Sequence, residues 1–128
     1  MTPDLDALAR RAVACPRWRW LPGMKNQAGT RIVRVEKDGY MVGIPKGWKL
    51  TTCVDTGYPP DLTDPATLGC LLALVREAYE DDFIGLEYDA PLGKWGAYAA
   101  EKGAWSTRLR GEGNTEAEAL VVALEAAP

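Results

Sequence analysis

The chain has no histidine and only three cysteines, and each shortage narrows the chemistry open to its 128 residues. Histidine is the commonest general base near neutral pH and the commonest metal ligand, so hydrolase sites that depend on imidazole are excluded. Cys15, Cys53 and Cys70 are far apart, and none belongs to a Cys-x-x-Cys pair. The sequence therefore predicts three reduced thiols, no metal site and no cofactor.

Long apolar runs are missing too, since none approaches the ~18 residues that a membrane-spanning helix needs. The opening residues Thr2-Pro3-Asp4 do not begin a charged segment followed by an apolar core, so no signal peptide is expected. No repeat, low-complexity tract or linker interrupts the sequence. These observations predict one domain over residues 1–128, located in the cytoplasm and without a membrane partner.

Acidic residues are absent between Asp6 and Glu36, although the net charge of the chain is −3. Residues 1–60 carry ten Lys/Arg against five Asp/Glu, whereas residues 61–128 carry five against thirteen. This asymmetry is the strongest compositional signal. It indicates either an anionic ligand for the basic half or a charge balance within the fold itself.

Inside that basic stretch, Arg17-Trp18-Arg19-Trp20 alternates guanidinium groups with indoles. Both groups stack on flat rings, and clustered cations attract phosphate, so a nucleotide or nucleic acid is a sensible ligand. The favoured alternative is structural, because indoles two residues apart on an extended segment anchor one face while the arginines stay in water. The candidate ligand- or partner-binding residues are Arg10, Arg11, Arg17, Trp18, Arg19, Trp20 and Lys25.

Three other segments invite a functional interpretation. The acids Glu77, Glu80, Asp81 and Asp82 lie at the end of a predicted helix. They are interpreted as a solvated helix end, or as a contact for Arg10 and Arg11 within the fold or for a basic surface on another protein. Gly111–Thr115 precedes a helix but lacks the P-loop lysine, so it is interpreted as a turn and a cap. Lys46-Gly47-Trp48-Lys49 fits a basic aromatic rim or an ordinary loop equally well.

Hydrophobic periodicity and capping residues predict three helices and about five strands. One helix is expected over 3–14. A second begins at Pro65 behind an Asp64 cap and ends at Asp81-Asp82, and a third follows a Thr115–Glu118 capping box. Strands are expected over 30–36, 40–44, 83–88, 95–100 and 104–110, with a further short one at 49–54. The order predicts an α+β fold, with a mainly antiparallel sheet of about five strands packed with three helices as an α/β sandwich. Whether the helices cover one sheet face or both stays open.

The second half also resembles a known family. Pro60-Asp61-Leu62-Thr63-Asp64 leads into an apolar helix, tryptophan-bearing strands follow, and Asn114–Leu120 begins a closing Ala/Leu helix. Over residues 60–127 this pattern is similar to small phage and prophage proteins grouped as phage ABA sandwich domains. The resemblance implies an α/β sandwich and a phage or prophage origin, and it carries over no catalytic residue.

Together these observations predict a protein that is not an enzyme and acts by binding. The resemblance implies a phage or prophage accessory protein that binds a host or phage protein, with counter-defence in the host cytoplasm as one use. The alternative is a nucleotide or nucleic-acid binding protein that uses the Arg/Trp segment. A carboxylate-dependent enzyme is a third and weaker hypothesis, and the oligomeric state is open.

Overall fold

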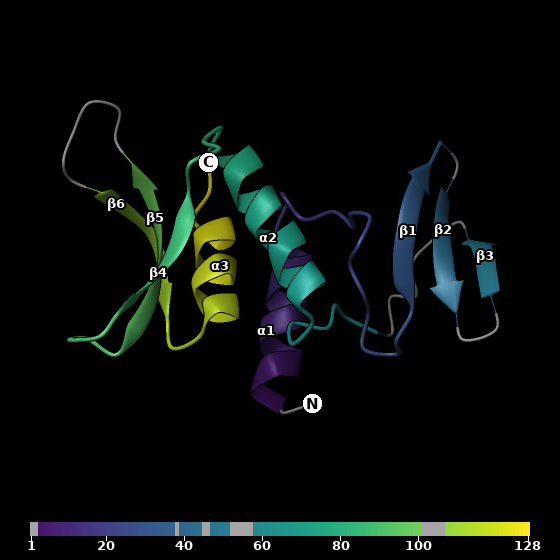
Figure 1. The fold of residues 1–128 in the computed structure, drawn as a ribbon, viewed down its shortest axis with the longest axis horizontal. Helices are drawn as coiled ribbons and strands as arrows, with labels where there is room; N and C mark the ends of the chain where they lie inside the picture. Colours follow the sequence, from purple (N-terminus) through teal and green to yellow (C-terminus); the bar gives the residue numbers. More distant parts are fainter. Residues whose placement is uncertain (1–2, 38, 45–46, 52–57, 101–106) are drawn as a thin grey trace. The chain divides into compact units, whose positions relative to one another are not determined.

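The computed structural model describes residues 3–37, 39–44, 47–51, 58–100 and 107–128. Over these ranges the protein is α+β, with three helices and two separate three-stranded antiparallel sheets (Figure 1). The chain divides into two compact units, Met1–Val13 with Arg19–Cys70 and Ala14–Trp18 with Leu71–Pro128. The single domain stays a prediction. No helix within the described ranges is both long and apolar enough to cross a membrane.

Helix α1, Pro3–Ala14, belongs almost entirely to the first unit and confirms the predicted helix. Proline is suited to a first helical position because its missing N–H would be unpaired there in any case. Asp4 and Asp6 lie in the first turn, where the helix dipole favours negative charge. Leu8, Ala9 and Ala12 form the buried stripe of the helix.

The first unit contains a meander of β1 (Arg31–Glu36), β2 (Gly39–Ile44) and β3 (Gly47–Thr51). The predicted hairpin is confirmed, because Val35 pairs with Tyr40 and Glu36 with Gly39. A register shift between Ile32 and Arg34 marks a β-bulge at the residue between them. The third strand begins two residues earlier than predicted, and residues 52–54 of that prediction lie outside the described residues.

A loop pairs with the outer edge of β1. The backbone N–H of Gly23 donates to the Ile32 carbonyl at 2.7 Å, and the N–H of Ile32 donates to the Met24 carbonyl at 2.8 Å. Asn26 is buried beside this pairing, and its Oδ1 accepts from the N–H groups of Ala28 and Thr30, both at 3.0 Å. This edge of the sheet is therefore protected by the protein's own backbone.

Helix α2, Pro65–Ala78, starts at the predicted proline, and the boundary between the units falls inside it after Cys70. The second unit continues with β4 (Gly85–Asp89), β5 (Lys94–Ala100), β6 (Thr107–Gly113) and α3 (Glu116–Glu125). The hydroxyl of Thr115 accepts from the N–H of Glu118 at 3.1 Å, which confirms the predicted cap of α3. Helix α3 lies along one face of the β4-β5-β6 sheet (Figure 1).

The prediction of one sheet of about five strands is wrong, because six strands form two sheets in the orders β1-β2-β3 and β4-β5-β6. Each sheet pairs strands that are neighbours in sequence, and α2 lies between the two groups of strands along the chain. Alternation of apolar residues shows that a segment is a strand with one buried face, but it leaves the partner of that strand unspecified.

The prediction of a turn at 111–114 is also wrong, because β6 continues through Gly113. A Cβ on Gly111 would lie 2.5 Å from the Ala123 nitrogen, and one on Gly113 would lie 2.6 Å from the Glu118 Cβ. The glycines are needed for close approach of α3 to the strand, rather than for a turn. Residues 104–106 of the predicted strand lie outside the described residues.

Candidate protein-binding surface

The seven residues predicted to bind a ligand are divided between the two units. Arg10, Arg11, Arg19, Trp20 and Lys25 belong to the first unit, and Arg17 and Trp18 belong to the second. The four arginines are exposed, whereas both indoles and the lysine are half-buried. Their role as a ligand site stays a prediction.

Three of these cations bind oxygen atoms within their own unit. The Arg10 Nε donates to an Asp6 carboxylate oxygen at 2.9 Å, and the Lys25 Nζ lies 3.5 Å from Asp61. The Arg17 guanidinium donates to the Pro128 carbonyl oxygen at 3.0 and 2.7 Å. A phosphate would have to compete with these acceptors for the same N–H groups.

The best-defined polar cluster lies at the start of α2. Asp64 accepts two hydrogen bonds from the Arg31 guanidinium, at 3.0 and 2.9 Å, and the same guanidinium also donates to the Gly23 carbonyl at 2.6 Å. The Asp64 side chain is 10% exposed. The bond from Arg31 holds the pKa of Asp64 well below its usual range, against the opposing effect of burial, and the pKa of Arg31 is raised in return.

The rest of this cluster completes the cap of α2. Asp64 also accepts from the N–H of Thr67 at 3.0 Å and from its hydroxyl at 2.8 Å, and that hydroxyl accepts from the Lys25 N–H at 3.0 Å. Burial opposes ionisation of Asp61, but hydrogen bonds from Thr63 and the nearby Lys25 ammonium together outweigh it, and the pKa of Asp61 is lowered. Because its donors and acceptors bind one another, this cluster is a structural N-cap.

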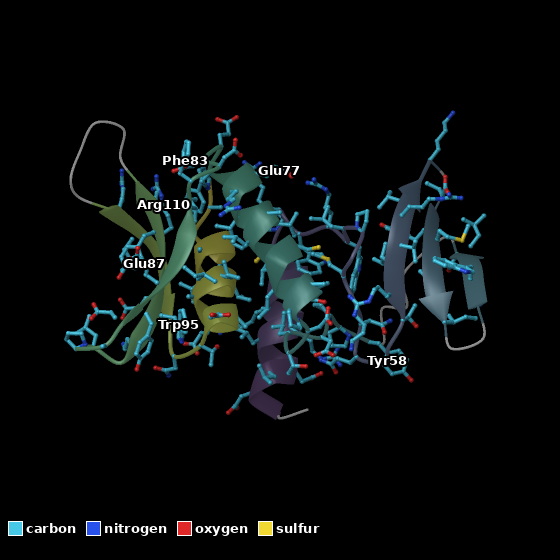
Figure 2. The ribbon with its side chains drawn as sticks, viewed as in Figure 1. Tyr58, Glu77, Phe83, Glu87, Trp95 and Arg110 are labelled. Atoms are coloured by element: carbon cyan, nitrogen blue, oxygen red, sulfur yellow. The ribbon has the colours of Figure 1, made fainter. Side chains whose placement is uncertain are left out.

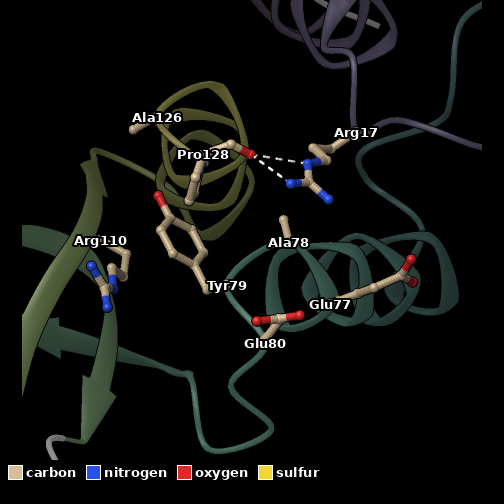
Figure 3. Close-up of a pocket in the computed structure, with 8 residues that line it drawn as sticks. All are labelled: Arg17, Glu77, Ala78, Tyr79, Glu80, Arg110, Ala126 and Pro128. Carbon is tan, nitrogen blue, oxygen red and sulfur yellow. Dashed lines mark hydrogen bonds between the residues drawn. The ribbon is translucent and has the colours of Figure 1, made fainter.

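A cavity of about 500 Å³ lies in the second unit, between the end of α2, β6 and the residues after α3 (Figure 3). The hydroxyl of Tyr79 donates to the Ala123 carbonyl at 2.8 Å, and the Arg110 guanidinium carbon lies 4.7 Å from the centre of the Tyr79 ring. Burial raises the pKa of Tyr79, although Arg110 acts in the opposite direction. Through Tyr79, the end of α2 therefore contacts both α3 and β6.

The lining of this cavity does not favour a polyanion. Glu77 and Glu80 line it together with the two arginines, and Arg17 is directed at the Pro128 carbonyl (Figure 3). Like charges near a phosphate cost free energy, so the carboxylates offset much of the attraction of the guanidinium groups. Over the described ranges, no group of three or more Cys, Asp and Glu side chains is arranged to hold a metal ion.

An exposed apolar surface lies on one face of the first sheet. Trp48 is 69% exposed and Leu50 is 61% exposed, and they alternate with Lys49 along β3. Their partners on β2 are Gly43 and Met41, respectively, so the side chains of Met41, Trp48 and Leu50 share a face. The bulge residue Val33, 38% exposed, joins them, because its Cγ2 would lie 3.7 Å from a Cβ on Gly43. Val33, Met41, Trp48 and Leu50 are called the β3 face below.

The opposite face of the same sheet holds the buried residues Ile32 and Val42, so the β3 face is not the core side. The sequence analysis placed Gly47–Lys49 in a loop or a basic rim and missed this surface; Lys46 lies outside the described residues. The alternation of Trp48 and Leu50 around Lys49 was the signal that could have revealed it.

The second unit also exposes large apolar side chains, at Phe83, Tyr88, Leu92 and Leu109. Phe83 is 81% exposed in the turn that precedes β4 (Figure 2), and Leu92 is 65% exposed in the turn between β4 and β5. Single exposed apolar residues are normal on protein surfaces. A tryptophan and a leucine on one strand beside two further apolar side chains form a contiguous patch, which is the kind of surface that marks an interface.

Comparison of the chain with protein-family models, with curated proteins and with solved structures finds no match. The resemblance to phage ABA sandwich domains therefore stays a prediction.

Proposed function

We propose that this protein acts by binding another protein and that the β3 face is the surface it uses. The exposure of Trp48 and Leu50 on one face of a sheet is the observation that carries the proposal. Tryptophan is enriched among the residues that dominate binding energy, because it buries a large area on a rigid ring. Removing such side chains from water is worth roughly 1.5–3 kcal/mol each when burial is complete.

The biological setting of the proposal comes from the resemblance. A phage or prophage accessory protein with this surface would bind a host or phage protein, and interference with a host defence factor is one use of such binding. Nucleotide or nucleic-acid binding is the second candidate, favoured by the exposure of Arg10, Arg11, Arg17 and Arg19. It requires affinity that falls steeply with salt concentration and is lost in an Arg17→Ala/Arg19→Ala variant.

Affinity capture with matched variants tests the proposed function. The immobilised protein, its Leu50→Glu variant and its Leu92→Glu variant are exposed to the same bacterial lysate, and each enriched protein is purified and its binding measured again. Both leucines are more than half exposed, so both variants are expected to keep the wild-type circular dichroism. A partner is expected to bind the wild type and the Leu92 variant equally and to bind the Leu50 variant at least tenfold more weakly.

Equal affinity of the purified partner for the wild type and the Leu50 variant would refute the use of the β3 face. The nucleic-acid alternative would be favoured instead if the protein bound single-stranded oligonucleotides and if the dissociation constant increased steeply with salt concentration.

A further inference from the structure

The two edge strands of the first sheet differ in how their backbones are covered. The outer edge of β1 is paired with Gly23 and Met24 through hydrogen bonds to and from Ile32. Strand β3 forms the other edge, and within the described ranges no strand or isolated bridge pairs with the outer side of Trp48, Lys49 and Leu50. The edge of a sheet can take up another strand through its backbone N–H and carbonyl groups.

The sequence of β3 disfavours pairing with a second copy of itself. A two-fold antiparallel pairing that aligns Trp48 with Leu50 of the other copy would place the two Lys49 side chains directly opposite each other. Like charges at opposed positions are destabilising, and an edge lysine is a common device against self-association. The same lysine attracts a strand that has an acid at that position.

We propose that the occupant of this edge is an extended segment of another protein, with the pattern apolar–acidic–apolar, added antiparallel to β3. This inference rests on the proposed function, because it names the partner chemistry of the same surface. The two apolar residues of the segment extend the β3 face beside Trp48 and Leu50, and its acid lies opposite Lys49. Main-chain bonds supply affinity and the alternating side chains supply specificity in this mode of recognition.

The charges around the edge support an acidic segment. Arg31, Arg34, Lys37 and Lys49 lie on or beside the three strands, whereas Glu36 is the one acid among the described residues from 31 to 51. Glu36 pairs with Arg34 and Arg31 pairs with Asp64, and Lys49 is the one of these four cations that lies on β3 itself. A cross-strand pair of opposite charge strengthens the register in which Trp48 and Leu50 both gain apolar neighbours.

Selection from a library of random peptides tests the charge rule. The wild-type protein is expected to enrich peptides with an acid between two apolar residues, and the Lys49→Glu variant is expected to enrich a base at the same place. The Lys94→Glu variant is the control, because this exposed lysine lies on β5. Absence of enrichment, or the same motif selected by the wild type and the Lys49 variant, would overturn the inference.

Backbone methylation of an enriched peptide tests strand addition itself. In an added strand, every second backbone amide points toward β3. N-methylation of the amides that point toward β3 is therefore expected to weaken binding at least tenfold, and N-methylation of the intervening amides is expected to leave the affinity unchanged. Equal effects of both sets would overturn strand addition. If binding needs Trp48 and Leu50 but not Lys49, the β3 face is still the docking surface, but the inference of an acidic added strand is overturned. If binding needs none of these three side chains, the proposed function is refuted as well.

Analytical sedimentation of the protein alone tests the alternative occupant of this edge, a second copy of the chain. The chain is expected to sediment without an association that depends on the β3 edge. A dimer that dissociates in a Trp48→Ala/Leu50→Ala variant, but not in a Leu92→Ala variant, would assign the edge to a second copy and overturn the proposal.

Discussion

Replacing Asp64 tests the structural assignment of the polar cluster at the start of α2. In Asp64→Ala the Thr67 N–H and hydroxyl lose their acceptor, and Arg31 loses both of its carboxylate bonds. In Asp64→Asn a side-chain oxygen remains to cap the helix, but the negative charge is removed. The pair of variants therefore separates the cap from the ion pair.

The expected loss of stability follows from these contacts. An N-cap is worth about 1 kcal/mol, and a hydrogen bond to a charged group is worth about 1.5–3 kcal/mol. The Arg31 side chain is 39% exposed, so water recovers part of the loss and the lower figure applies. We expect about 2–3 kcal/mol for Asp64→Ala and about 1–2 kcal/mol for Asp64→Asn.

At acid pH the free energy of unfolding of the wild type should fall to that of Asp64→Asn. The pKa of Asp64 is held down in the folded state chiefly by Arg31, so the unfolded chain takes up the proton first as the pH falls. The contribution of this carboxylate is therefore complete above the unfolded pKa of about 3.9 and declines below it. The lowered pKa of Asp61 makes the stability of the wild type fall with acid in the same sense, but Asp61 is present in both proteins and is not part of their difference.

Urea unfolding followed by far-ultraviolet circular dichroism measures these differences. With a slope of about 2 kcal/mol per molar urea, Asp64→Ala should lower the midpoint by about 1–1.5 M. Combining Asp64→Ala with Arg31→Met gives the coupling between the two side chains. If Asp64→Ala left the midpoint unchanged at pH 7, or if Asp64→Asn were as costly at pH 7 as Asp64→Ala, the division into cap and ion pair would be wrong.

Three further predictions use the same unfolding measurement. Gly111→Ala should cost about 1–3 kcal/mol, because its Cβ would meet backbone atoms of α3, whereas the matched change Gly69→Ala should stabilise by about 0.5–1 kcal/mol, because its Cβ meets nothing within 4 Å. Equal effects of the two changes would contradict this explanation. Thr115→Ala should cost about 1 kcal/mol through loss of the α3 cap, and Thr115→Ser should restore stability. Tyr79→Phe should cost about 1 kcal/mol through its bond to Ala123. It should also remove a late phase from the phenolate absorbance titration, because the pKa of Tyr79 is raised; an unaltered titration curve would contradict the burial of this hydroxyl.

Local chemistry was readable from the sequence. Asp64 before Pro65 identified the start of α2, and Thr115 with Glu118 identified the start of α3, because capping depends on residues a few positions apart. The hairpin of β1 and β2 was equally local. The α+β class followed from these elements and is confirmed.

Contacts between distant segments were not readable in the same way. Gly111 and Gly113 resemble turn residues in a sequence, and only the position of α3 shows that they are strand residues under a helix. The bond from Arg31 to Asp64 joins residues 33 positions apart, and the sequence analysis identified Asp64 only as a helix cap and gave no role to Arg31. Two three-stranded sheets and one larger sheet also share the same alternation of apolar and polar residues.

The tryptophans show why the sequence analysis did not select the β3 face. Trp18 and Trp20 drew attention because they alternate with arginines, yet both are half-buried, whereas Trp48 is 69% exposed. Residue type alone cannot separate them, since an indole serves equally well as an anchor in a core and as an anchor in an interface. What distinguishes Trp48 is its strand, which ends a sheet and carries Leu50 on the same face with Lys49 between them. In our proposal, the Lys49 that disfavours pairing of β3 with a second copy also favours a partner strand with an acid at the opposite position. The proposed function therefore depends on β3 being an edge strand, which only the order of strands in the sheet shows.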